Sequence, residues 1–224
     1  MSTPPTPPTT RAERLEPSSG IERRPRPRIE SLADLIFGLS LAIDSIALLP
    51  TAATTPDDMN RRILIFAFAF LFLITAWLIY TTYMSVLPSD SSTVTFLNVA
   101  LLLLVALIPY LLNNVVIGDP AIRDYSSGLF TLDLFGILVI LAFFAHIISL
   151  EENRMVAPDL AKIFRNGRNR MALLAVLMAV SFAPPFGQWT LLGVQVRILL
   201  WTAPLISYWL GRALRPQSRT YKLA

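Results

Sequence analysis

Long apolar blocks separated by short polar segments dominate the chain from residue 29 onward. A helix that crosses a bilayer needs about 20 predominantly apolar residues. Six blocks approach or reach that length: residues 29–49, 63–87, 94–112, 129–150, 171–184 and 191–210. The fifth block is short because Pro184 and Pro185 end it, so its helix either tilts or begins earlier in the preceding segment. The pattern predicts an all-α integral membrane protein with six transmembrane helices in one bundle.

Composition supports a chain that is solvated by lipid. Of the 224 residues, 54% are hydrophobic and only 15% are charged, whereas soluble domains usually carry about 25% charged residues. The sequence contains no cysteine, which excludes disulfides and thiolate metal sites. Residues 1–28 hold seven of the 17 prolines and few large apolar side chains, so we expect a disordered tail there. Residues 29–210 then form one six-helix unit, and residues 211–224 form a basic C-terminal tail.

The basic residues predict how the helices are oriented in the membrane. With six spans, one side receives six arginines before residue 29, five basic residues in 151–170 and four in 211–224. The other side receives only Arg61, Arg62 and Arg123. Because positive charge stays cytoplasmic, both termini are expected in the cytoplasm of a multi-pass cell-membrane protein. Residues 155–166 suit either an interfacial helix or an ordinary polar connector.

The first block carries an apolar stripe with carboxylates behind it. At 100° per residue, Leu39, Ile43 and Ile46 lie within about 60° of one another on a helix. Asp34 and Asp44 point to the opposite side. A carboxylate inside a membrane is costly unless it faces protein or water and has a partner. Taken alone, the stripe is most simply a surface that touches lipid or a neighbouring helix.

The start of this block resembles the signature of the transmembrane protein 175 family, the lysosomal and prokaryotic potassium channels. In that family an arginine precedes a Phe-Ser-Asp triplet by four residues. Arg28 and Asp34 fall on the arginine and the aspartate, whereas Leu32 and Ala33 replace the phenylalanine and the serine.

The second and third blocks extend the resemblance. The third block contains Asn98 near its start and Ile108-Pro109 later, as does the family's third helix. The second block contains Trp77, but Tyr80 and Thr81 stand where many members carry histidines.

The resemblance implies a potassium-preferring cation channel. Family members of the prokaryotic type have one six-helix unit per subunit, and four subunits surround a pore lined by the first helix. The positions of the narrow hydrophobic constriction correspond here to Leu39, Ile43 and Ile46. An apolar ring discriminates between ions largely by the cost of stripping their water, which predicts moderate selectivity. Ala42 stands where members commonly place a threonine, so selectivity is expected to be lower still.

The polar residues of the predicted spans suggest two structural groups. Asp34, Tyr80, Thr81, Asn98 and His146 all fall in the cytoplasmic halves of their spans, and we expect one hydrogen-bonded cluster that holds the first span against spans two to four. His146 is the only histidine, which favours a structural role over a pH sensor or a metal site.

A charged pair is expected near the outer surface. Asp44 and Arg197 lie at similar depths, about 8–10 Å below it. We expect them to pair within a subunit. In the alternative, Arg197 extends outward and Asp44 faces a water-filled vestibule.

Two other functions remain open from the sequence. One is a secondary transporter that uses Asp44, Asp133 and Arg197 as coupling residues within the membrane. The other is a membrane scaffold that transports nothing. The sequence has no phosphate-binding loop, metal-ligand spacing or nucleophile elbow, so neither an enzyme nor a cofactor is expected. Its basic residues lie in loops and tails instead of forming a groove, so nucleic acid is not an expected partner.

Overall fold

The computed structural model describes residues 28–46, 55–88, 91–150, 156–191 and 194–214. The expected disordered tail, residues 1–28, lies outside these ranges except for Arg28. The basic C-terminal tail lies outside them after Leu214.

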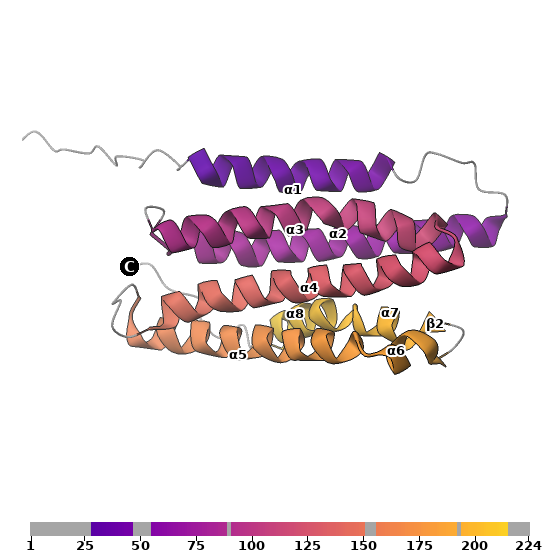
Figure 1. Cartoon of the computed structure of the whole chain (residues 1–224). Helices are drawn as coiled ribbons and strands as arrows, with labels where there is room; N and C mark the ends of the chain where they lie inside the picture. Colours follow the sequence, from indigo (N-terminus) through magenta and orange to yellow (C-terminus); the bar gives the residue numbers. More distant parts are fainter. Residues whose placement is uncertain (1–27, 47–54, 89–90, 151–155, 192–193, 215–224) are drawn as a thin grey trace, which may run out of the picture.

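Five long helices run side by side in an elongated bundle (Figure 1). They are α1 (Arg28–Ile46), α2 (Pro56–Met84), α3 (Ser92–Ile117), α4 (Pro120–Ser149) and α5 (Pro158–Ser181). Among the described residues, three helical stretches are long and apolar enough to cross a membrane: Pro56–Met84, Ser92–Val116 and Pro120–Ser149. The prediction of an all-α membrane protein is therefore confirmed at this level.

Local sequence signals explain where these helices begin. Proline occupies the first turn of α2, α4 and α5, where its missing N–H would have no helical partner in any case. The Thr55 side chain caps α2 by accepting a hydrogen bond from the Asp58 backbone N–H at 3.1 Å. Asp57 and Asp58 also place negative charge at the positive end of the helix dipole.

The fifth helix begins before the apolar block that predicted it. Residues 158–166, weighed as an interfacial helix or a polar connector, form the first turns of α5, and the connector interpretation is wrong for them. The helix is continuous through the polar run 165–170 and ends at Ser181, just before Pro184 and Pro185. Hydropathy missed its start because polar residues can continue a helix that emerges from the bilayer.

The sixth predicted span, residues 191–210, is not one helix. Strands β1 (Thr190–Leu191) and β2 (Val194–Gln195) pair antiparallel, and helices α7 (Val196–Leu200) and α8 (Ala203–Ala213) follow. Pro204 explains the break between α7 and α8, because it has no N–H to donate to the carbonyl of Leu200. A second short helix, α6 (Pro184–Gln188), precedes the hairpin.

The core lies between the four helices that follow α1. Helix α4 packs against α3 on one side and α5 on the other, and its apolar residues Phe130, Leu134, Ile137 and Phe144 are completely buried. Helix α1 covers one outer side of the bundle, where it packs mainly on α2 and α3 (Figure 1). It begins at the end of the bundle toward which α8 runs.

Candidate pore-lining helix

Helix α1 has one buried face and one exposed apolar face. Ala33, Phe37, Ser40 and Asp44 follow one another at helical spacing and are buried against the bundle. On the other face Leu39, Ile43 and Ile46 are 56%, 43% and 57% exposed. The structure thus places the apolar stripe away from the core of the helix bundle.

Two side-chain contacts join the first half of α1 to α2. The Trp77 indole N–H donates a hydrogen bond to Asp34 Oδ1 at 2.9 Å. The rings of Phe37 and Tyr80 pack with their centroids 5.7 Å apart. Asp34, the motif aspartate, therefore helps to hold α1 against α2 by accepting this hydrogen bond. Its carboxylate is only partly desolvated because Asp34 is exposed.

The middle of α1 is joined to α3 at a carbonyl that a proline leaves free. The Ser40 hydroxyl donates to the backbone oxygen of Val105 at 3.3 Å. In a regular helix that oxygen would accept from the N–H of residue 109, but residue 109 is a proline inside α3. Ser40 thus supplies the donor that Pro109 lacks, in a setting where a carbonyl without a partner is costly.

The C-terminal half of α1 and an arginine of α2 line one cavity. Asp44 and Arg62 line the same cavity of about 30 Å³, between α1, α2 and α3. Within the described ranges, Asp44 Oδ2 has no hydrogen-bond partner. Arg62 also forms an ion pair with Asp58, with Nη2 and Oδ2 2.9 Å apart. The cavity is of the size that holds one or two water molecules between polar groups.

The hydrogen bonds among the described residues do not join the expected polar residues into a single cluster. Thr81 donates to the backbone oxygens of its own helix. The His146 ring contacts Arg168 of α5 at 3.2 Å, so it faces away from α1. Asn98 is completely buried, and its side-chain amide has no hydrogen-bond partner among the described residues. Among the described residues, Asp34 contacts Trp77 of α2, and Tyr80 contacts Phe37 of α1. The side chain of Arg28 lies outside the described part of the chain.

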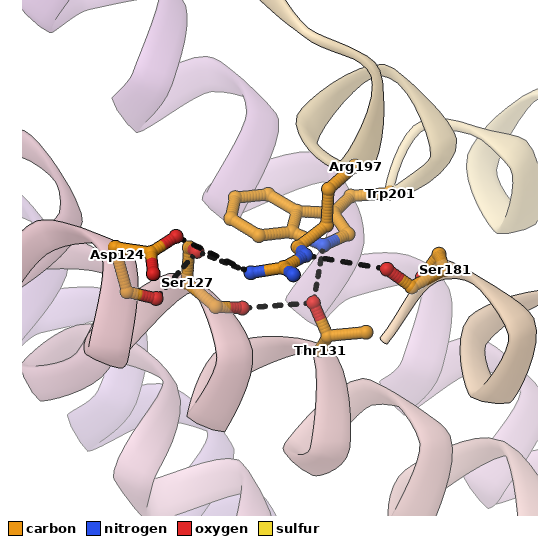
Figure 2. Close-up of polar contacts among 6 residues, drawn as sticks. All are labelled: Asp124, Ser127, Thr131, Ser181, Arg197 and Trp201. Atoms are coloured by element: carbon orange, nitrogen blue, oxygen red, sulfur yellow. Dashed lines mark hydrogen bonds and ion pairs between the residues drawn. The ribbon is translucent and has the colours of Figure 1, made fainter. Parts of the chain in front are cut away.

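Arg197 of α7 has partners on α4 and α5 (Figure 2). Its Nη1 donates to Ser127 Oγ at 3.0 Å, and its Nε donates to the backbone oxygen of Ser181 at 3.2 Å. Asp124 Oδ1 lies 3.7 Å from Nη1 and supplies a partly solvated counter-charge. A Cβ on Gly187 would lie 2.7 Å from Nη2, so this glycine makes room for the guanidinium group.

The residue that ends α7 contacts α4 one turn further along. The Trp201 indole N–H donates to Thr131 Oγ1 at 3.0 Å, and the Trp201 ring packs edge-on against Phe130 at 4.5 Å between centroids. Ser127 and Thr131 each donate to a carbonyl of their own helix and accept from a residue of the last span (Figure 2). Asp44 faces α2 and α3 instead, so the Asp44–Arg197 pair expected from the sequence is wrong.

Comparison with known proteins decides the fold. The structure matches the crystal structure of a lysosomal potassium-selective channel TMEM175 homolog from Chamaesiphon minutus, with a TM-score of 0.57 and 13% sequence identity. The match covers 82% of this chain and 96% of that chain. The chain has the fold of that channel homologue. No family model and no curated protein matches the sequence.

The match confirms, at the level of the fold, the resemblance found in the sequence. The TMEM175 homologue is a channel and not an enzyme. Sequence reasoning missed the contacts of Ser40, Ser127 and Thr131, because a single hydroxyl in an apolar helix usually bonds within its own helix. The available signal was positional: Pro109 frees a carbonyl, and Ser127 and Thr131 lie four residues apart on one face of α4.

Proposed function

We propose that this protein is a subunit of an oligomeric, potassium-preferring cation channel whose pore is lined by the outward face of α1. The observation that carries the proposal is the two-faced structure of α1. Its polar and small residues contact α2 and α3, whereas Leu39, Ile43 and Ile46 point away from the subunit. The fold shared with a potassium-selective channel homologue supports this function.

The acidic residues of α1 indicate that most of the surface of this helix faces protein or water and not lipid. The helix contains Glu30, Asp34 and Asp44 within 19 residues. Acidic residues in a span normally face the bundle interior or a water-filled cavity. A helix surrounded by other subunits at a pore satisfies that requirement better than a helix at the lipid boundary.

The oligomer follows from what one subunit lacks. One copy of α1 presents an apolar face but encloses nothing, so several copies around an axis are needed to make a pore. We propose a homotetramer, as in the family that the sequence resembles. Rings of Leu39, Ile43 and Ile46 would then form a hydrophobic constriction that conducts when wetted and closes when it dewets.

Paired substitutions in α1 test the pore. Leu39→Ala should keep the constriction hydrated more of the time, raising conductance and lowering the potassium/sodium permeability ratio. Leu41→Ala removes the same atoms from a residue that packs partly against the subunit's core, so it should change stability and leave the ratio nearly unchanged. Single-channel recording of the purified protein in bilayers measures both. Equal effects at the two sites would show that Leu39 does not line the conduction path.

We also propose that both termini lie in the cytoplasm. This orientation rests on the distribution of basic residues. The chain has no cysteine, so single cysteines can be introduced without a background. Ser91→Cys, between α2 and α3, should react with an impermeant thiol reagent only from the inside, and Asp119→Cys, before α4, only from the outside. The reverse pattern would invert the topology.

A secondary transporter is the second candidate, because the last span is interrupted between α7 and α8. Interrupted spans form binding sites in several transporter folds. Asp133 is buried in α4, and neither of its carboxylate oxygens has a hydrogen-bond partner among the described residues. A coupled transporter should lose flux in Asp133→Asn and show no discrete current steps. A channel should show such steps, and they should persist in Asp133→Asn.

A further inference from the structure

A groove of about 800 Å³ runs along the outer surface between α4 and α5. Its walls are apolar, and alanines make it hollow: Ala142 lines it from α4, and Ala172 and Ala179 line it from α5. Larger side chains, including Phe143 and Val176, stand exposed at its rims. An apolar surface alone is expected where a helix faces lipid, so the hollow between α4 and α5 is the feature that distinguishes this surface.

One end of the groove carries a positive charge. Arg168 and His146 line that end, near the C-terminus of α4. Arg168 Nη1 lies 3.2 Å from His146 Nδ1, and because arginine can only donate, His146 accepts and adds no charge. The remaining contacts of Arg168 are to the Asn169 side-chain oxygen, at 3.1 and 2.9 Å. Within the ranges that the structure describes, no carboxylate forms an ion pair with Arg168.

The length of the groove matches one half of a bilayer. From Arg168 to Val180 the α5 wall rises through twelve residues, about 18 Å at 1.5 Å per residue. One leaflet of the hydrocarbon core is about 15 Å thick. A positive end followed by an apolar hollow of this length is complementary to an amphiphile with an anionic head and a hydrocarbon chain.

We propose that this groove binds one anionic phospholipid, with its phosphate at Arg168 and one acyl chain along Ala172 and Ala179. His146 holds the guanidinium group at the mouth, and the alanines leave the space that the chain fills. The site does not depend on the proposed pore, since α1 lies on the other side of the bundle (Figure 1). A second copy of the chain would have to bring both a carboxylate and a matching ridge to the same groove.

Native mass spectrometry of the purified protein with phosphatidylglycerol or phosphatidylcholine tests whether the Arg168 end of the groove binds an anionic head group. Wild-type protein should retain phosphatidylglycerol in preference to phosphatidylcholine. Arg168→Gln should lower the retained phosphatidylglycerol about fivefold, the size expected for one interfacial arginine. Lys162→Gln removes the same charge from an exposed position of α5 outside the groove and should have little effect. Equal losses in the two variants would overturn the proposal in favour of general surface charge.

A second pair of variants tests the acyl-chain half without touching a charge. Ala172→Phe fills the groove from an exposed position and should reduce the retained lipid, whereas Leu173→Phe, on the exposed side of α5 outside the groove, should not. If Ala172→Phe leaves lipid retention intact, no acyl chain lies in the groove. If it instead changes the oligomeric state with lipid retention unchanged, a second copy covers the groove, and the lipid proposal is wrong.

Discussion

Helices α1 and α7 are attached to the bundle in opposite ways. Helix α7 is five residues long, and its Arg197 is buried, with only 6% of the residue exposed. Arg197 contacts two neighbouring helices through hydrogen bonds, and Trp201 adds a third attachment. Helix α1 is 19 residues long, buries one narrow face and leaves the apolar face opposite it open.

The difference reflects what drives helix association in lipid. Apolar side chains gain little by moving from lipid to protein, so close packing and polar contacts decide which helices associate. A short interrupted segment such as α7 cannot satisfy all its own backbone groups and depends on polar attachments to α4 and α5. A continuous helix such as α1 satisfies its own backbone, so it needs few attachments and can leave a whole face free of contacts with its own bundle.

Removal of the polar attachment of α7 should have the largest effect on the stability of the protein. Arg197→Gln should lower the free energy of unfolding by about 3 kcal/mol, because it removes two charge-assisted hydrogen bonds and leaves Ser127 and the Ser181 carbonyl buried. Thermal unfolding of the purified protein in detergent measures the change.

Arg123→Gln is the matched control for that substitution. Arg123 belongs to the same end of α4 but is exposed, and within the described residues its side chain donates a hydrogen bond to the Gly118 carbonyl, at 3.3 Å. Its loss should cost less than about 0.5 kcal/mol. Similar effects at the two arginines would mean that Arg197 is not a structural attachment.

The sequence predicted the helices whose length and apolar composition suit a crossing of the bilayer. The apolar blocks located α2, α3 and α4 because a span must be long and apolar. They left two alternatives for the fifth helix, a tilt or an earlier start, and the structure has the earlier start. They missed the β1–β2 hairpin, since residues 191–195 are as apolar as a helix would be. Hydropathy reports burial in lipid and does not distinguish a strand from a helix in a short apolar run.

For the candidate site, too, the sequence predicted one feature correctly and another incorrectly. Helical periodicity correctly separated the Leu39 stripe from Asp44, because the 100° step fixes which residues share a face. It gave Asp44 the wrong partner, because sequence position gives depth in the membrane and does not say which helix stands beside α1. Arg62 lines the cavity that Asp44 lines, whereas Arg197 contacts α4 and α5, and only the packing of the helices distinguishes the two arginines.

A double-mutant cycle sharpens this point. Asp44→Asn and Arg62→Gln should be non-additive, with a coupling of about 1–2 kcal/mol, since both line one cavity. Asp44→Asn and Arg197→Gln should be additive within about 0.5 kcal/mol, since they lie on different sides of the bundle. The cycle also subtracts the separate cost of the Arg62–Asp58 pair. Coupling to Arg197 in place of Arg62 would restore the pairing expected from the sequence.

The smallest expected effect tests the hydrogen bond from Ser40 of α1 to α3. Ser40→Ala removes the donor to the Val105 oxygen, and we expect a loss of about 1 kcal/mol in the free energy of unfolding. The effect exceeds that of a typical surface hydroxyl because Pro109 leaves this oxygen without a helical donor. Ser45→Ala is the control: its hydroxyl is exposed and donates to Ala42 within α1, so its loss should cost little.

The proline itself supplies the decisive comparison. Pro109→Ala restores an N–H four residues after Val105, so the oxygen regains a donor inside α3. In that background Ser40→Ala should cost almost nothing, although every other contact of Ser40 is unchanged. A loss that is just as large in the Pro109→Ala protein would mean that Ser40 stabilises α1 through packing alone. Loss of the effect would show that a proline in one helix creates the position at which another helix attaches, which is how α1 can be held by few contacts and still keep its other face open.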